Sequence, residues 1–374
     1  MGLYIHVPFC GSICSYCHFA RTSVHDRSSR EQYVDGVLAE LALRGEKCRV
    51  LGDGMRPLDT AYFGGGTPSL LEPDLMRRLV TGTVGTFDPA PDFEFTAEAN
   101  PESLTRELAE VWLDLGIERV SLGVQSLQDD VLRVLGRSCN SVMARQALKL
   151  ACGIFPRVSA DWILGPDLRI DYLLAELSEA ADLGVEHFSL YILEIHQGTA
   201  LQQDVRRGRL VLPGDELTER LYLAAGEHLE KLGIEQYEVA NFSRPGAESR
   251  HNGNYWNGRP YLGLGPGAHG FWGRRRYANE ADPDRWSEAL ASGRLPEAEV
   301  DPLDLPARRL ERAILALRTC RGLPLDWLPA QTLDLEKGQA MGWWKVNGDR
   351  LILTRLGFLR VDGFEEALAG RILS

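Results

Sequence analysis

The sequence predicts an α/β protein: an incomplete (β/α)6-type barrel, followed by a small C-terminal α/β domain of winged-helix-like pattern. Two observations support this class. Short strand-like segments alternate with longer amphipathic segments over the first 240 residues, and strand–helix units in series favour parallel strands joined by right-handed crossovers. The 374 residues, 44% of them hydrophobic and 25% charged, are also enough to bury a large core.

Six segments rich in β-branched or aromatic residues are the expected barrel strands. They span residues 3–7, 60–63, 93–97, 119–124, 158–164 and 187–193, with a seventh strand expected at 236–240. Between them, leucine, valine and alanine recur every three to four residues, as in amphipathic helices. These helices are expected at 29–47, 70–80, 104–115, 128–136, 141–151, 171–183 and 215–232. We assign the barrel to residues 1–240.

The last third of the chain has a different pattern. Residues 241–280 are rich in glycine, asparagine and tryptophan and show little periodicity, and proline-containing segments follow, so we expect a connecting segment over 241–299. Residues 300–374 are expected to form the small C-terminal domain. Its expected elements are a helix at 307–318, a hairpin made from 351–354 and 358–361, and a last helix at 363–373.

Charge and hydropathy exclude some functions. The net charge of −12 argues against a nucleic-acid-binding protein, because such binding needs clustered cations. No run of 18 or more apolar residues is present, so no membrane span is predicted. The first residues lack the basic region and cleavage site of a signal peptide. We therefore expect a cytoplasmic protein.

The seven cysteines divide into two groups. Cys10, Cys14 and Cys17 lie within eight residues, directly after the first expected strand. Cys48, Cys139, Cys152 and Cys320 are scattered. In a reducing compartment, clustered cysteines indicate metal ligands, whereas isolated ones behave as small buried hydrophobic residues.

Three thiolates leave a metal site one ligand short. A tetrahedral zinc ion and a [4Fe–4S] cluster each ordinarily take four protein ligands. The spacing therefore favours a cluster with one iron open to another ligand, as in a catalytic site. The alternatives are a zinc loop completed by His18 or His25, and three buried thiols.

Further polar residues follow the other strands, where function collects in α/β barrels. The second strand leads into Gly64-Gly65-Gly66-Thr67, whose backbone can approach a ligand closely. Four more candidates are Glu98, Gln125, Arg137 and Asp161. Each alone fits a surface, turn or capping role. Together they point to one mouth of the barrel, where the Arg137 guanidinium could clamp a carboxylate.

The Cys10-x3-Cys14-x2-Cys17 spacing resembles the signature of the radical S-adenosylmethionine (SAM) superfamily. The resemblance implies a [4Fe–4S] cluster whose open iron binds SAM. The reduced cluster would cleave SAM to methionine and a 5′-deoxyadenosyl radical, which abstracts hydrogen from a substrate. It also implies that the backbone of Tyr16 meets the adenine and that the glycine-rich loop binds the SAM amino group.

Within this superfamily the chain resembles the oxygen-independent coproporphyrinogen oxidase-like family over most of its length. The matching stretches are 3–10, 64–69, 98–101, 120–126, 237–242, 251–256, 261–269 and 353–358. The resemblance implies two SAM sites in oxidase members. Tyr4, Gly65, Glu98 and His269 match the positions that serve the cluster-bound SAM, and Gly66, Thr67, Gln125, Arg137 and Asp161 match those that serve the second.

Two features are similar to the heme-chaperone members of that family rather than to its oxidases. The oxidases have a fourth cysteine where this chain has Phe19. The run His251-Asn-x-x-Tyr255-Trp256 is similar to a heme-binding motif, and an imidazole beside flat aromatic side chains suits heme. The alternative for this run is a structured loop with a buried histidine.

The resemblance implies a chaperone that binds heme and hands it to an acceptor hemoprotein, with a flavodoxin-type donor as reductant. The alternative is an oxidase that converts coproporphyrinogen III to protoporphyrinogen IX. Its substrate carries four carboxylates, for which Arg137 and Arg157 are the candidate cations at the mouth. The chain departs from the family pattern at His18, at Cys139 and over 164–169, which bears on the second SAM site and leaves the cluster untouched.

Overall fold

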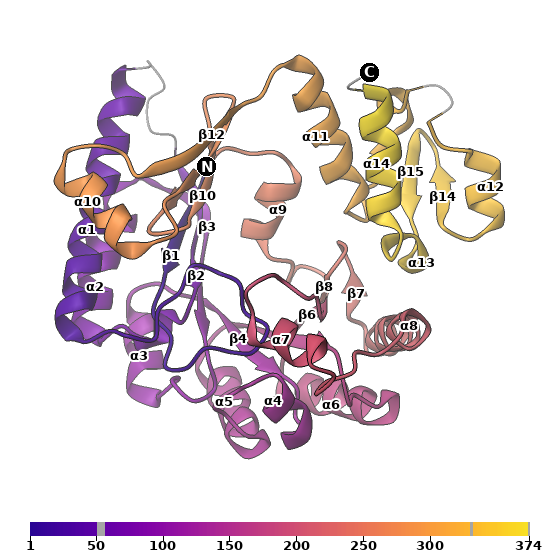
Figure 1. Cartoon of the computed structure of the whole chain (residues 1–374), viewed down its shortest axis with the longest axis horizontal. Coiled ribbons are helices and arrows are strands. Elements are labelled where there is room, and N and C mark those ends of the chain that lie inside the picture. Colours follow the sequence, from indigo (N-terminus) through magenta and orange to yellow (C-terminus); the bar gives the residue numbers. More distant parts are fainter. Residues whose placement is uncertain (51–56, 330–331, 373–374) are drawn as a thin grey trace.

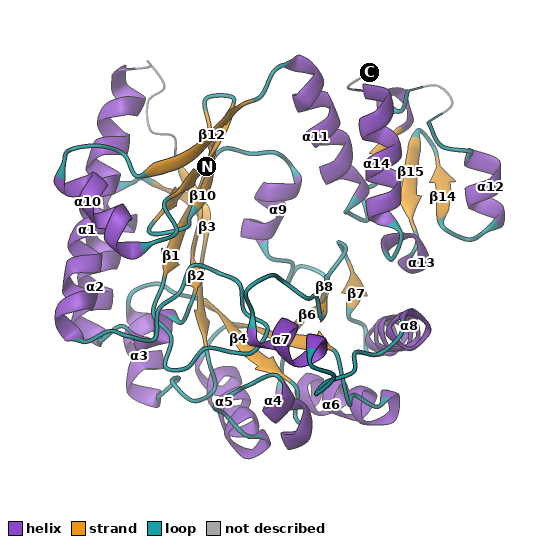
Figure 2. Ribbon diagram, in the orientation of Figure 1, coloured by secondary structure: helices purple, strands orange, loops and turns teal. Residues whose placement is uncertain are grey.

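The computed structural model describes residues 1–50, 57–329 and 332–372. Its centre is a curved sheet in which six parallel strands follow one another in chain order (Figures 1 and 2). They are β1 Gly2–Val7, β2 Leu58–Gly65, β3 Pro89–Ala99, β4 Arg119–Gln125, β5 Arg157–Leu164 and β6 His187–Ile192. The structure thus confirms the incomplete parallel barrel. The carboxyl ends of all six strands meet at one mouth.

Most helices that connect these strands pack on the convex side of the sheet (Figure 1). They are α1 Arg27–Val50, α2 Pro73–Gly82, α3 Arg106–Asp114, α4 Asp129–Val134, α5 Ser141–Ile154, α6 Ile170–Leu183 and α8 Asp215–Lys231. Side chains fix their starts: Thr105 accepts from the amide of Leu108, and Asn140 from that of Met143. None of the helices that the structure describes is long and apolar enough to cross a membrane.

The stretch 241–299, expected as a connecting segment, supplies strands to both edges of the sheet. β8 Asn241–Ser243 follows β6 at one edge, and β7 Glu235–Gln236, which precedes this stretch, pairs beyond it. At the other, β9 Tyr261–Leu264 pairs in parallel with β1, followed by β10 His269–Trp272, β11 Arg275–Asn279 and β12 Glu297–Pro302. The same stretch carries α9 Arg250–Trp256 and α10 Pro283–Ala291. β1 therefore lies inside the sheet, between β2 and β9.

The C-terminal residues form a separate three-stranded antiparallel sheet with its own apolar core. Its elements are α11 Leu305–Leu317, β13 Leu323–Pro324, α12 Leu335–Ala340, β14 Trp344–Asn347, β15 Arg350–Leu353, α13 Arg355–Phe358 and α14 Val361–Ile372. The expected hairpin between 351–354 and 358–361 is wrong, because β15 pairs with β14 and Thr354 caps α13 by accepting from the amide of Gly357. Short 3-10 turns occur at Pro68–Leu70, Val84–Thr86 and Leu325–Trp327. One further helix, α7 Ala200–Arg206, lies at the mouth of the barrel.

Backbone pairing attaches this C-terminal unit to the barrel. The amide of Val239 donates to the carbonyl of Arg318 at 2.9 Å, and the amide of Cys320 donates to the carbonyl of Tyr237 at 3.0 Å. On α13, Arg355 forms an ion pair of 2.6 Å with Glu230 of α8. The unit is therefore fixed to the residues that follow α8.

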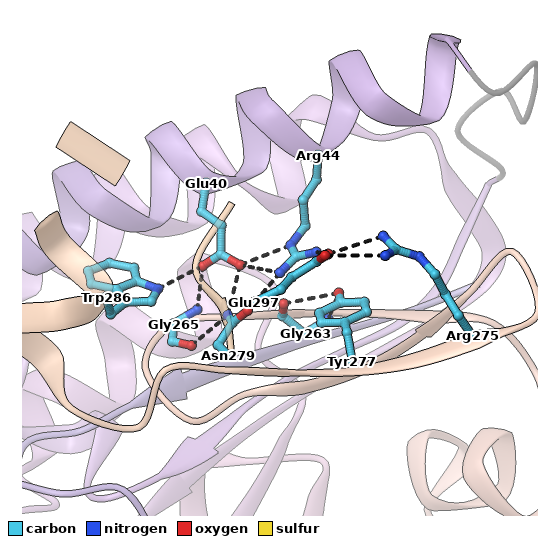
Figure 3. A network of polar contacts seen from close by, with 9 residues as sticks. All are labelled: Glu40, Arg44, Gly263, Gly265, Arg275, Tyr277, Asn279, Trp286 and Glu297. Carbon is cyan, nitrogen blue, oxygen red and sulfur yellow. Dashed lines mark hydrogen bonds and ion pairs between the residues drawn. The ribbon is translucent and has the colours of Figure 1, made fainter. Parts of the chain in front are cut away.

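A buried carboxylate joins α1 to the β9–β12 edge (Figure 3). Glu40 has no exposed surface and accepts from Nε and Nη2 of Arg44, the amide of Gly265, and the side chains of Asn279 and Trp286. The distances from these donors to the carboxylate lie between 2.7 and 3.0 Å. A buried charge is tolerated when its oxygens are satisfied in this way. Glu40 thus holds the loop before β10 against α1.

Removing this carboxylate should destabilise the whole protein. We expect Glu40→Ala to lower the free energy of unfolding by about 3 kcal/mol or more, because the buried Arg44 loses a partner. Glu46→Ala changes an exposed glutamate on the same helix and should cost less than about 0.5 kcal/mol. Urea unfolding of both variants measures the difference, and equal losses would contradict the role of Glu40.

Candidate functional site

The three clustered cysteines line a cavity of about 400 Å³ at the carboxyl ends of the barrel strands. That volume lies in the range of small-ligand sites. Eight of the ten residues expected to bind SAM line the same cavity: Tyr16, Gly65, Gly66, Thr67, Glu98, Gln125, Arg137 and Asp161. Residues that are up to 151 positions apart in sequence (Cys10 and Asp161) thus meet, because each follows or ends a different strand.

The cysteine loop is held at both ends by backbone hydrogen bonds. The amide of Cys10 donates to the carbonyl of Thr22 at 3.0 Å. In the middle, the amide of Ser15 donates to the carbonyl of Leu135 at 3.0 Å, and its carbonyl accepts from the amide of Leu201 at 2.8 Å. The residues after α4 and the start of α7 therefore fix how the loop presents its thiols.

The surroundings of the thiols suit a bound cation. Burial raises the pKa of Cys10 to about 11 and also raises that of Cys17. Such thiols become thiolates only when a positive group stabilises them. Arg137, whose side chain is only 4% exposed, places Nη1 3.4 Å from the sulfur of Cys14. The hydroxyl of Thr67 lies 3.8 Å from the sulfur of Cys10.

The two histidines considered as zinc ligands have other partners. In His25, Nε2 donates to the carbonyl of Cys10 at 3.1 Å and Nδ1 accepts from Arg30 at 2.7 Å. The ring of His18 stacks on that of His196, with 3.6 Å between centroids. In the described part of the chain, no three histidine, cysteine or acidic side chains gather closely enough to hold one ion. A cluster fits wider spacing, since its thiolates bind different irons.

Two glycines bring the end of β2 against β1. A Cβ on Gly66 would lie 2.7 Å from the carbonyl oxygens of Val7 and Phe9. One on Gly65 would lie 2.5 Å from the ring of His6, and Gly65 also has a φ of +107°, which L-residues rarely adopt. The loop is therefore a cradle whose backbone amides can face a ligand.

Glu98 is the acidic side of this cradle. It accepts from the amide of Gly65 at 3.0 Å and from the hydroxyl of Tyr62 at 2.7 Å. Burial raises the pKa of its carboxyl, and these two donors oppose that shift. Tyr62 did not appear among the candidates. It faces the same side of β2 as Gly64 because side chains alternate along a strand, which is the signal that would have found it.

Tyr4 and His269 do not line the cavity. Tyr4 packs behind it, stacks on Tyr62 with 6.2 Å between centroids, and donates to Nδ1 of His6 at 3.0 Å. The other ring nitrogen of His6 donates to the carbonyl of Ala20 at 2.6 Å. His269 is exposed at the start of β10. Tyr4 therefore supports the cradle, whereas His269 lies outside it.

Arg137 does not have the free guanidinium that a carboxylate clamp needs. Its Nη2 donates to the side chain of Asn100 at 2.9 Å and to the carbonyl of Gly123 at 2.8 Å. Asn100 in turn donates to the hydroxyl of Thr67 at 3.1 Å. Gln125, at a φ of +68°, keeps a buried side-chain oxygen without a partner. Arg137 thus organises the cysteine loop, and Gln125 offers an acceptor to a ligand.

Asp161 is a second carboxyl in the cavity. Burial raises its pKa to about 7, and the nearby charge of Glu98 adds to the effect. The hydroxyl of Ser121 lies 3.5 Å from it. Tyr191, which sequence reasoning missed, also lines the cavity and is 46% exposed. The cavity therefore offers two carboxyls of high pKa and one aromatic surface.

The three residues expected to contact heme lie on α9, on the concave side of the sheet (Figure 1). His251 is only 1% exposed; Nδ1 pairs with the hydroxyl of Thr60 and Nε2 with that of Tyr255, both at 2.8 Å. Burial lowers its pKa to about 3. The arrangement matches the buried histidine weighed as the alternative. Trp256 alone of the three lines cavities.

Comparisons with known proteins identify the class to which the fold belongs. A family model described as the Radical SAM superfamily matches residues 4–179. Coproporphyrinogen III oxidase (HemN) from Escherichia coli superposes with a TM-score of 0.83 at 20% identity, covering 98% of this chain and 89% of that one. The fold and the cysteine loop thus define a radical SAM protein.

Sequence relatives narrow the class. The heme chaperone HemW of Mycobacterium tuberculosis is 37% identical, covering 99% of this chain and 95% of that protein. HemW of Bacillus subtilis is 32% identical, covering 86% and 84%. The chain belongs to the HemW family of radical SAM proteins.

The residues present fit the group that this superfamily holds. Cys10, Cys14 and Cys17 would hold a [4Fe–4S] cluster, and the Gly65–Thr67 cradle with Glu98 and the unpartnered oxygen of Gln125 would hold SAM. When bound, this pair supplies one-electron cleavage of SAM. Arg137 and Thr67 keep the loop thiols in place through their contacts with the sulfurs of Cys14 and Cys10.

Loss of one clustered cysteine should remove the iron–sulfur chromophore. We expect Cys14→Ser to abolish the brown absorbance of the anaerobically reconstituted protein, because two thiolates cannot retain the cluster. Cys320→Ser changes an exposed, unclustered cysteine and should leave the absorbance intact. Iron and sulfide analysis of both variants supplies the measurement; a coloured Cys14→Ser protein would refute the ligand assignment.

Asp161 should make stability depend on pH. Between about pH 4, where a free aspartate titrates, and pH 7, the native state holds a proton that the unfolded chain has lost. The free energy of unfolding therefore falls as pH rises through this window. We expect Asp161→Asn to remove that fall, so its stability relative to wild type is higher at pH 8 than at pH 5. Asp182→Asn, at an exposed site, is the control; a pH-independent difference would contradict the shift.

Proposed function

We propose that this protein is a heme chaperone, which binds heme and delivers it to an acceptor hemoprotein. The observation that carries the proposal is the full-length likeness to proteins named heme chaperone HemW, with 99% of this chain covered at 37% identity. The likeness includes the C-terminal unit and α9, which lie outside the matched superfamily region of 4–179.

The heme contact is proposed at α9, where His251, Tyr255 and Trp256 lie. Trp256 supports it most directly, because its indole lines two cavities and its Nε1 is buried without a hydrogen-bond partner. His251 would have to release Thr60 or Tyr255 before either ring nitrogen could ligate iron. In the described conformation, its ring holds α9 against β2.

The oxidase alternative lacks the cations that it needs at the mouth. Arg157 lies at the start of β5, forms an ion pair of 3.1 Å with Glu186, and lines a different cavity. The expectation that it serves the mouth is therefore wrong. The described arginines that line the cysteine cavity are Arg21 and Arg137, and Arg137 is already engaged. Four substrate carboxylates would find little positive charge there.

We place the protein in the cytoplasm, with a flavodoxin-type protein as electron donor to the cluster. The six cysteines whose side chains the structure describes are all free, as a reducing compartment would leave them. Cys48 lies outside the described side chains. The net charge of −12 opposes the approach of a small acidic donor, so docking would need a local basic surface, and the salt dependence of cluster reduction tests for one.

A turnover assay separates chaperone from oxidase. We expect the reduced, reconstituted protein with SAM to leave coproporphyrinogen III unchanged under anaerobic conditions, while it binds hemin and passes it to an apo-hemoprotein. Protoporphyrinogen formation over many turnovers would overturn the chaperone proposal. The Cys14→Ser variant controls for chemistry that does not need the cluster.

Substitutions on α9 test the heme contact. We expect Trp256→Ala to weaken hemin binding about tenfold, because the ring loses an aromatic surface. If the ring of His251 turns toward heme and ligates the iron in the wild-type protein, His251→Ala should abolish the absorption band of an imidazole-ligated hemin. An unchanged spectrum in His251→Ala identifies it as a positioning residue, and unchanged affinity in Trp256→Ala would place heme elsewhere.

A further inference from the structure

A second, cationic cavity lies beside Trp256, at the junction of α9, α11 and the C-terminal sheet. Its volume is about 260 Å³, and its lining includes Arg312, Arg321, Arg350, Trp256 and Trp327. No aspartate or glutamate lines it, although the chain as a whole carries a net charge of −12. Such a concentration of one sign of charge in an acidic protein indicates an anionic ligand.

The three arginines have no carboxylate partner among the described residues. Arg321 donates to the side chain of Asn257 at 3.2 Å. Arg350 donates to the backbone carbonyl of Gly322 at 3.0 Å, and the guanidinium of Arg312 lies 4.4 Å over the ring of Trp327. Their charges are thus left for a ligand to neutralise.

Neighbouring arginines behave differently. Arg318, directly after the end of α11, binds the carboxylate of Glu365 through Nε at 2.6 Å. Arg355 on α13 is paired with Glu230. Arg318 and Arg355 are thus neutralised by carboxylates, whereas the three arginines that line the cavity are not. This contrast favours a built site over a random surface distribution of charge.

Trp256 connects this cavity to a larger one of about 830 Å³ at the amino ends of β3, β4 and β5. Trp256, Asn257, Thr319 and Arg321 line both. A ligand larger than either cavity can therefore lie along the indole and reach the arginines with one edge. A flat apolar ring system with carboxylates on one edge has that shape.

We propose that Arg312, Arg321 and Arg350 bind the carboxylates of a planar tetrapyrrole whose ring lies along Trp256. This inference rests on the proposed function, because the tetrapyrrole is the heme that the chaperone would carry. Guanidinium groups bind carboxylates through paired N–H donors, and aromatic side chains beside them cover the apolar ring. The site shares no lining residue with the cysteine cavity.

The test uses the full-length, cluster-reconstituted protein and compares hemin with hemin dimethyl ester, which lacks free carboxylates. We expect wild type to bind hemin about tenfold or more tightly than the ester. The double variant Arg321→Ala/Arg350→Ala should lose that preference, and should lose the same factor for iron-free protoporphyrin IX, because the contact does not involve iron. Raised salt should weaken wild-type binding of hemin more than binding of the ester.

Arg77→Ala, an exposed arginine on α2, is the matched control and should bind hemin as wild type does. Equal affinity of wild type for hemin and its ester would overturn the inference while leaving the chaperone proposal standing. Hemin binding by the double variant at wild-type affinity would also overturn the inference and leave the chaperone proposal standing. If wild type binds neither porphyrin, the proposed function itself fails.

Discussion

The close approach of the glycine loop after β2 to strand β1 is the constraint on which the candidate site depends. Without side chains at Gly65 and Gly66, the loop backbone lies against His6 and the carbonyls that begin the cysteine loop. In this position of the loop, the amide of Gly65 donates a hydrogen bond to the carboxylate of Glu98. Any larger residue would push the loop from β1, and the thiols and carboxylate would no longer face one cavity.

The barrel separates two kinds of chemistry along its axis. Buried thiols and carboxyls of raised pKa lie at the carboxyl ends of the strands, where barrel sites ordinarily form. Arginines without carboxylate partners lie beyond the amino ends, at the junction with the C-terminal unit. Separation of this kind keeps an anionic ligand away from thiolates, which would repel it.

Strand periodicity and cysteine spacing predicted the barrel and most of its cavity, because both depend on local sequence. The β9–β12 extension escaped prediction, since its strands are short and are separated by glycine-containing turns or, between β11 and β12, by α10. Arg157 was assigned to the wrong end, because a residue that starts a strand lies opposite the mouth. Burial of His251 was one of the two alternatives that its motif left open, but its partner Thr60, 191 residues away in sequence, could not be foreseen. Such contacts come from topology rather than from any motif.

An unbroken line of contacts runs between the two ends. Glu98 accepts from Tyr62, whose ring stacks on His251 at 5.1 Å between centroids, and His251 pairs with Tyr255 on the helix that ends at Trp256. Thermodynamic linkage is symmetric. If a ligand at Glu98 changes the affinity for a ligand at Trp256, the second ligand changes the affinity for the first by the same factor. His251 is the residue in this series that contacts both β2, through Thr60, and α9, through Tyr255.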